Sequence, residues 1–197
     1  MTKDALREQV LRDRAARSPQ LRAVVADALA SHLLASAVSR ADRVACYLSM
    51  GTEPGTGPLI TGLLQRGAEI IVPVGAPGNL LDWVRFEPTS VLRRSPIGIP
   101  EPDGPRLGTD ALSTVGLVII PALAVDHAGY RIGRGAGYYD RALVGVTAPV
   151  CAVVHAAELM ESVPHEDHDV PVQLAVTEAG LFRVSPDATR GPAGSSS

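Results

Sequence analysis

The chain of 197 residues is long enough to fold as one α/β domain with a substantial core. Apolar residues make up 46% and charged residues 20% of the sequence, a composition typical of soluble globular proteins. A net charge of −3 and an aromatic content of 4% supply neither the basic face nor the stacking platforms of nucleic-acid-binding proteins, so the composition argues against that class.

Cysteine usage and the apolar runs indicate a cytoplasmic protein. Cys46 and Cys151 each lie in an apolar stretch, as buried thiols do, and they lack the close spacing of a disulfide or metal site. Residues 1–17 alternate acids and bases and lack the apolar stretch of a secretion signal. The longest apolar run, 115–125, contains Pro121 and is too short to span a membrane. We expect a soluble cytoplasmic monomer that binds neither nucleic acid nor membranes.

Helical patterns dominate the first part of the chain. Ser18 followed by Pro19 predicts a helix start, with a capping side chain before proline at the first helical position. The apolar stripe from Leu21 to Leu33, which contains Val24, also includes His32, so a packed histidine is favoured over a ligand. In chain order we predict a charged helix over 3–16, this second helix, a buried strand over 44–49, a helix from Pro58 to a cap at Gly67, and strands over 69–74 and 80–86.

Strands and helices alternate in the rest of the chain. Residues 87–105 are rich in Pro and Gly and predict a long functional loop or lid. Further strands are predicted over 115–120, 149–154 and 172–176, with a helix beginning around Tyr138. This alternation predicts an α/β fold, a single three-layer domain with a mostly parallel central sheet and helices on both faces. We place the domain at 1–183 and expect 184–197, which is poor in apolar residues, to be a disordered tail.

The segment 119–143 carries the chemical signal. It leaves a buried strand, passes through a Gly-rich loop and enters a helix, so the loop lies at the carboxyl end of a strand, where ligands bind in open α/β sheets. Gly133, Gly135 and Gly137 alternate, which lets the backbone approach a ligand closely and present successive N–H donors. The helix that follows turns its N-terminus toward the same place, an arrangement that favours anions.

Charged side chains in this segment suit a phosphate group and a metal ion. Arg131 and Arg134 have planar donor forks that match phosphate oxygens. Asp140, at the helix start, can offer a carboxylate to a magnesium ion that bridges phosphates. Glycines alone would equally suit a tight strand-to-helix connection, and the pattern is neither a Walker A loop nor a clean dinucleotide fingerprint. Together with the two arginines and the aspartate, they favour a phosphate site.

Several motifs, taken together, resemble a known family. Residues 131–141, RIGRGAGYYDR, which follow PALAVDHAG at 121–129, closely resemble the signature of 5-formyltetrahydrofolate cyclo-ligases, also called methenyltetrahydrofolate synthetases. Further segments resemble family motifs in the same order: the lysine–arginine pair of 3–7, the first-strand segment 47–53, the G-x-x-E-P loop at 98–102 and the acidic segment at 168–171. The resemblance spans Lys3 to Phe182, and ordered motifs are more specific than any single one.

The resemblance implies an activity and a site. The activity is the ATP-dependent conversion of 5-formyltetrahydrofolate to 5,10-methenyltetrahydrofolate with Mg²⁺, releasing ADP and phosphate. The implied ATP-binding residues are Lys3, Arg7, Arg131, Ile132, Gly133, Arg134, Gly135, Ala136, Gly137, Tyr138 and Tyr139. The implied catalytic residues are Arg134, Arg131 and Asp140, the residues that bind the reduced folate are Leu48 and Glu53, and those that hold magnesium are Asp140 and Asp169.

Two departures from the family pattern leave alternatives open. Gln173 stands where the family repeats an aspartate, which removes a carboxylate near the implied metal, and Val125 replaces an aromatic residue. A nucleotide-binding module without catalysis would keep the Gly-rich loop and lose the folate pocket. A sugar-phosphate isomerase or acyl-transfer enzyme on a similar sheet would act without ATP.

Overall fold

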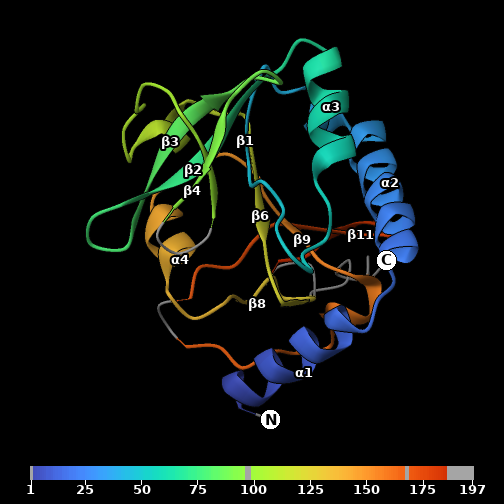
Figure 1. Ribbon diagram of the computed structural model, residues 1–197. Helices are drawn as coiled ribbons and strands as arrows, with labels where there is room; N and C mark the ends of the chain where they lie inside the picture. The colour runs from blue at the N-terminus through green and yellow to red at the C-terminus, as the bar shows by residue number, and fades with distance from the viewer. Residues whose placement is uncertain (1, 96–98, 167–168, 186–197) are drawn as a thin grey trace, which may run out of the picture.

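The computed structural model describes residues 2–95, 99–166 and 169–185, and its centre is a seven-stranded sheet (Figure 1). In spatial order the strands are β12 (Gly180–Arg183), β11 (Leu174–Thr177), β9 (Val150–Val153), β6 (Leu117–Pro121), β1 (Arg43–Cys46), β2 (Glu69–Ala76) and β3 (Leu80–Phe86). The inner pairs are parallel, and the two edge strands, β3 and β12, run antiparallel to their neighbours. The predicted α/β fold with a mostly parallel sheet is therefore confirmed.

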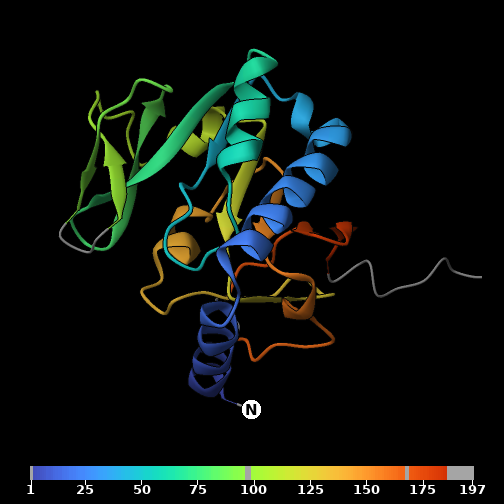
Figure 2. The same cartoon turned by 45° about the vertical axis from the view of Figure 1, so that its right-hand side comes forward.

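Helices cover both faces of this sheet, but unequally. The long helices α2 (Pro19–Ala35) and α3 (Gly57–Gln65) lie side by side on one face, where Val44 and Cys46 of β1 meet them (Figure 2). The opposite face, to which Ala45 points, is covered by the short 3₁₀ helix η2 (Ala111–Thr114) and by α4 (Tyr138–Ala142). Because successive strand residues point to opposite faces and both faces are buried, the inner strands have continuous apolar sequences.

Helix α2 begins as its sequence predicts, but its buried face differs from the predicted stripe. Ser18 Oγ accepts a hydrogen bond of 3.2 Å from the Leu21 N–H, and Pro19 occupies the first turn. Leu21 and Val24, expected in the stripe, are 45% and 65% exposed. The buried residues are Val25, Ala26, Leu29, Ala30 and Leu33. His32 is packed as expected, with Nε2 3.2 Å from a backbone carbonyl. The face that α2 buries depends on where α3 and the sheet lie, which apolar spacing alone does not specify.

A second sheet, which the sequence did not predict, carries the start of the Gly-rich segment. Its strands, in order, are β10 (Leu159–Met160), β7 (Ala124–Asp126) and β8 (Arg131–Ile132), and it packs against helix α1 (Lys3–Ala15). Leu6 and Val10 of α1 contact Leu123, Ile132 and Val163. Strands of two or three residues are too short to show a hydrophobic period. This packing holds the N-terminal helix beside the predicted phosphate loop (Figure 1).

Residues 87–105, predicted to be a long loop, contain a short hairpin. Its antiparallel strands are β4 (Leu92–Arg94) and β5 (Pro100–Pro102). The hairpin lies beside the ends of β2 and β3 (Figures 1 and 2). Proline within a short segment argues against a strand, and it is tolerated here because a two-stranded hairpin consists of edge strands alone.

The folded chain continues beyond the predicted domain boundary at residue 183. Val184 is fully buried, and its N–H donates to the Gln173 carbonyl at 3.0 Å. The Ser185 N–H donates to the His127 carbonyl at 3.2 Å. The rest of the expected tail, 186–197, lies outside the described residues. No helix among the described residues combines the length and the apolar content needed to cross a membrane.

Candidate active site

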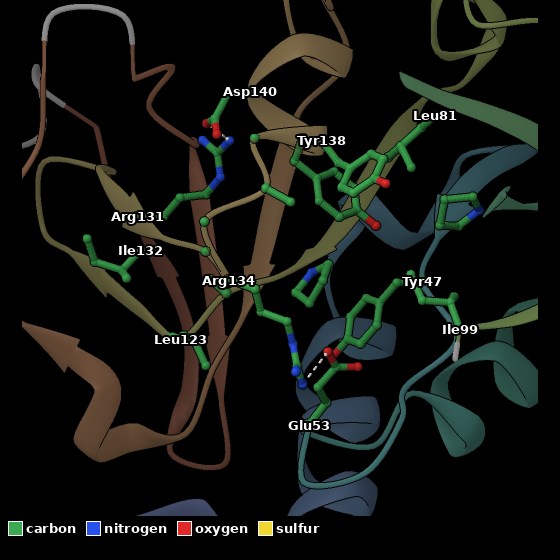
Figure 3. Close-up of a pocket in the computed structure, with 18 of the residues that line it drawn as sticks. Tyr47, Glu53, Leu81, Ile99, Leu123, Arg131, Ile132, Arg134, Tyr138 and Asp140 are labelled. Carbon is green, nitrogen blue, oxygen red and sulfur yellow. Dashed lines mark hydrogen bonds and ion pairs between the residues drawn. The ribbon is translucent and has the colours of Figure 1, made fainter. Parts of the chain in front are cut away.

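One cavity of about 520 Å³ is lined by every residue that the sequence analysis assigned to a site. These residues are Lys3, Arg7, Leu48, Glu53, the run from Arg131 to Asp140, and Asp169. Figure 3 shows part of this lining. The cavity lies at the carboxyl ends of parallel strands, since Tyr47 and Leu48 follow β1 and Leu123 follows β6. Helix α1 contributes Lys3 and Arg7 from the other side. The fold thus brings together segments from the whole length of the chain.

The cavity has a charged half and an apolar half. In Figure 3, Arg131 and Asp140 lie on one side, and Tyr47, Leu81 and Ile99 lie on the other. A pocket that is mostly apolar with a few convergent polar groups is typical of small-molecule sites. The charged half suits a polyphosphate, and the apolar half suits a flat ring system.

Glycine is required at two positions of the loop between β8 and α4. Gly135 and Gly137 have φ values of +97° and +69°, in the left-handed region that strains any residue with a Cβ. Gly137 immediately precedes α4, which has no side-chain cap and is only five residues long. A helix of that length adds little dipole, so the donors available to an anion are mainly the N–H groups of the loop itself.

Two arginines hold the carbonyl groups of this loop. Arg7 Nε donates to the Gly133 carbonyl at 2.9 Å, which ties the loop to α1. Arg141 Nη2 donates to the Ala136 carbonyl at 2.7 Å, and its Nε donates to the Asn79 carbonyl at 3.1 Å, which ties the loop to the β2–β3 turn. With its carbonyls directed to these arginines, the loop is positioned from both sides.

Two cations in the charged half are paired with carboxylates. Arg131 Nη2 lies 2.5 Å from Asp140 Oδ1. Burial lowers the pKa of Arg131, but Asp140 and Asp169 oppose that shift, and a guanidinium keeps its proton in proteins. Lys3 Nζ lies 2.8 Å from Asp169 Oδ2 and 3.1 Å from Glu166 Oε1. The hydrogen bond to Asp169 raises the pKa of Lys3. Both cations therefore stay charged beside the phosphate loop.

Glu53 lies at the junction of the two halves. Its side chain is 8% exposed, with Oε2 accepting a 3.0 Å hydrogen bond from the Met50 N–H and Oε1 3.3 Å from Arg134 Nη2. The Arg134 side chain is 50% exposed, so its guanidinium can move toward a ligand with little loss of packing. The Arg134–Glu53 pair, drawn as a dashed line in Figure 3, connects the residues expected to bind the nucleotide with those expected to bind the folate.

Tyr47, Tyr138 and Tyr139 line the cavity and give it an aromatic surface. The Tyr47 hydroxyl donates to the Pro54 carbonyl at 2.8 Å, which fixes the ring. Burial raises the pKa of both Tyr47 and Tyr139 well above the ordinary value, so both phenols stay neutral at physiological pH. They offer ring faces and hydroxyl groups without adding negative charge.

Asp140 and Asp169 fit a magnesium ion. Their side chains are 38% and 12% exposed, and both line the charged half, where solvent and phosphate oxygens can complete a coordination shell. Mg²⁺ typically binds through one or two carboxylates together with substrate phosphates and water. Among the described residues, no group of three or more His, Cys, Asp or Glu side chains gathers into a metal site. Two carboxylates beside a loop predicted to bind phosphate are the kind of donor set that this ion uses.

The sequence analysis missed a buried ion pair beside the cavity. Arg14, which is 1% exposed, places Nε and Nη2 2.8 and 2.6 Å from the carboxylate oxygens of Glu158. Its Nη2 also donates to the Ala122 carbonyl at 2.6 Å. A signal was present, because Arg14 follows Leu6 and Val10 at intervals of four residues and so lies on the apolar face of α1. The pair anchors the helix that carries Lys3 and Arg7.

Neither of the two departures from the family pattern lines the cavity. Gln173, expected near the metal, does not line the cavity. Its Oε1 accepts a 2.9 Å hydrogen bond from the Val150 N–H at the beginning of β9, and its Nε2 donates to the Pro171 carbonyl at 3.3 Å. Val125 is fully buried in the core. Neither substitution changes the charge around Asp140 or Asp169.

Comparisons with known proteins agree with this geometry. The family model for the 5-formyltetrahydrofolate cyclo-ligase family matches residues 1–178. A 5-formyltetrahydrofolate cyclo-ligase of Mycolicibacterium smegmatis is 36% identical over 185 residues, covering 89% of this chain and 93% of that protein. One of Escherichia coli strain K12 is 35% identical over 152 residues, covering 74% of this chain and 82% of that protein. The structure of Aquifex aeolicus 5,10-methenyltetrahydrofolate synthetase superposes with a TM-score of 0.80 and 29% identity, covering 100% of this chain and 97% of that one. The chain therefore belongs to the 5-formyltetrahydrofolate cyclo-ligase family and is an enzyme of that family.

Proposed function

We propose that the protein converts 5-formyltetrahydrofolate to 5,10-methenyltetrahydrofolate with ATP and Mg²⁺, releasing ADP and phosphate. The observation that carries this proposal is that one cavity joins a cationic Gly-rich loop to a buried carboxylate, Glu53, through Arg134. A nucleotide and a folate bound in these two halves would be in direct contact, as a phosphoryl transfer between them requires.

The reaction has to activate a formamide, which is a poor electrophile with a poor leaving group. Transfer of the γ-phosphoryl group from ATP to the formyl oxygen yields ADP and an imino-phosphate. The folate N10 then attacks the formyl carbon, the bond from carbon to the phosphorylated oxygen breaks, and N10 loses its proton as the ring closes. The attack is intramolecular, where orientation contributes about 7–11 kcal/mol, so the protein has most to supply in the phosphoryl transfer.

Cations and loop amides provide the charge stabilisation that phosphoryl transfer needs. Arg131, in β8, and Arg134, within the loop that would hold the phosphates, both line the cavity, and Lys3 and Arg7 add charge from α1. Donors that are already oriented stabilise charge developing in a transition state without reorganisation at the moment of reaction. Arg7 has a second task, since it also positions the loop through the Gly133 carbonyl.

In the proposed complex, phosphate oxygens take over the donors of Arg131 and Lys3. The carboxylates now paired with these cations, Asp140 and Asp169, then become available to hold magnesium. When bound, the magnesium ion would neutralise part of the negative charge of the phosphates. This exchange of partners keeps both carboxylates compensated by positive charge before and after binding.

The folate is proposed to occupy the apolar half. At the junction with the charged half, the Glu53 carboxylate can accept hydrogen bonds from the ring N–H groups of the pterin. Leu48, Leu81 and Ile99 offer an apolar surface, and Tyr47 an aromatic one. A neutral, flat ring with one donor edge matches a pocket with one buried acceptor.

Two observations favour this function over a non-catalytic nucleotide-binding module. Such a module has no need of a second, apolar half with a buried carboxylate, and this cavity contains both. Gln173, which lent support to the module, lies outside the cavity.

The decisive experiment mixes the purified protein with MgCl₂, ATP and 5-formyltetrahydrofolate and follows the methenyl product by its absorbance. The expected result is product formation that requires all three components, with one phosphate released per product. Nucleotide binding without folate-dependent phosphate release would select the non-catalytic module. Turnover without ATP would select an isomerase or acyl-transfer enzyme.

Location and oligomeric state are also proposals. Buried, unbridged thiols at Cys46 and Cys151 support a reducing compartment such as the cytoplasm, and burial raises the pKa of Cys151 to about 12, which keeps it unreactive. We propose a monomer, because a complete cavity is formed within one chain. Light scattering coupled to size-exclusion chromatography would measure the mass directly.

A further inference from the structure

The β4–β5 hairpin forms part of the cavity lining, and one of its carboxylates accepts a hydrogen bond from the central sheet. Ile99, Pro100 and Glu101 line the cavity. Glu101 Oε1 accepts a 2.8 Å hydrogen bond from the Gly75 N–H of β2. Glu101 comes from the G-x-x-E-P segment, and the proposed function gives its carboxylate no task.

The backbone N–H groups at the end of β2 need such a partner because β2 extends past β1, its parallel neighbour. The ladder between β1 and β2 ends at the pair Ala45–Ile71, whereas β2 continues to Ala76 beside β3. In an antiparallel ladder alternate residues direct their N–H groups away from the partner strand, and Pro73 and Gly75 belong to the same alternate set. Proline has no N–H, and the N–H of Gly75 is taken by Glu101. Beyond Ile71, these two outward-facing positions of β2 therefore leave no N–H donor without a partner.

No other hydrogen bond joins the hairpin to the sheet within the described residues of 92–102. The ion pair between Arg93 and Asp103, at 2.6 Å, lies on the solvent side of the same segment, with side chains 75% and 52% exposed. After the hairpin, the Leu107 N–H donates to the Trp83 carbonyl at 2.9 Å and anchors the chain to β3. Besides the packing of β5 against β2 and β3, the hydrogen bond of Glu101 is therefore what fixes Ile99 and Pro100 against the sheet.

We propose that Glu101 is a positioning residue for the folate half of the cavity, acting through its hydrogen bond to Gly75. This inference rests on the proposed function, which assigns the half containing Ile99 to the folate. Loss of the bond releases the hairpin and loosens the apolar half. The phosphate loop is held separately by Arg7 and Arg141, so the charged half keeps its geometry.

The variants Glu101→Ala, Glu101→Gln and Asp103→Ala separate this role from others. Glu101→Ala removes the acceptor, Glu101→Gln keeps an amide oxygen that can accept the same bond, and Asp103→Ala breaks an exposed contact of the same segment. We expect Glu101→Ala to raise the KM for 5-formyltetrahydrofolate about fivefold to tenfold, the effect of losing one ordinary intramolecular hydrogen bond, with the KM for ATP unchanged. Glu101→Gln should restore most of the loss, and Asp103→Ala should behave as wild type.

A second readout does not depend on activity. Amide hydrogen exchange at Gly75, followed by NMR without substrates, should be about tenfold faster in Glu101→Ala than in wild type, because the N–H loses its acceptor. The inference is overturned if both KM values rise together, if Glu101→Gln is as impaired as Glu101→Ala, or if exchange at Gly75 is unchanged. Wild-type turnover is measured first, so a failure of the proposed function is recognised before the variants are compared.

Discussion

Replacing Arg14 by methionine tests the buried ion pair that anchors α1 beside the cavity. The substitution leaves the Glu158 carboxylate, whose side chain is 6% exposed, with the His155 N–H at 2.8 Å as its remaining described partner. Removing one member of a buried pair costs about 3–5 kcal/mol, because the other charge stays buried without compensation. Domains of this size are stable by about 5–15 kcal/mol, so Arg14→Met should remove a large share of the stability.

Urea unfolding followed by circular dichroism measures the effect. A matched control is Arg12→Met on the same helix, since Arg12 pairs with Glu8 at 3.6 Å with side chains 68% and 74% exposed. Exposed pairs of this kind contribute about 0.3–0.5 kcal/mol, so the control should unfold almost as wild type. The double variant Arg14→Met/Glu158→Met should recover most of the loss, because no buried charge is left unpaired. A destabilisation of Arg14→Met below about 1 kcal/mol, or a double variant no more stable than the single one, would contradict the assigned role of the pair.

Three other predictions concern the site and its surroundings. Asp140→Ala and Arg134→Ala should each lower turnover by about 10²–10³-fold while circular dichroism stays unchanged, and near-normal rates would show that the site is misassigned. Glu53→Gln should raise the KM for 5-formyltetrahydrofolate about tenfold, with the KM for ATP within about twofold, and equal changes in both would remove the folate assignment of this carboxylate. Burial lowers the pKa of His155 to about 3, so the folded protein binds fewer protons than the unfolded chain, whose histidine titrates near 6.5. Stability should therefore be lost as the pH falls from about 6.5 toward 3. In urea titrations, the free energy of unfolding should fall between pH 7 and pH 5 in wild type, and this fall should be about 1–2 kcal/mol smaller in His155→Leu.

Many elements of the fold could be predicted from local patterns. The runs that form β2, β6 and β9 are continuously apolar because both faces of these strands are buried, and that property is visible in each segment alone. Ser18 and Pro19 mark a helix start through contacts within one turn. Gly135 and Gly137 fit a loop that needs left-handed backbone angles. Family resemblance then supplied site residues, and all of them line one cavity.

Contacts between distant segments could not be predicted in this way. Arg7 reaches the Gly133 carbonyl across 126 positions, and Arg14 reaches Glu158 across 144. These contacts exist because α1 packs its apolar face on the small β10-β7-β8 sheet, and strands of two or three residues have too few side chains to show a period. Gln173 had been expected near the metal, but the pairing of β11 with β9 places it against the Val150 N–H instead.

The physical reason for this division is the range over which each interaction acts. Backbone angles, capping and strand burial depend on residues close together in the chain, so one sequence is enough to locate the elements. The partners of a buried charge such as Arg14, and the hairpin that Glu101 ties to β2, depend on which surfaces the elements bury against one another, and those surfaces are defined by packing in three dimensions.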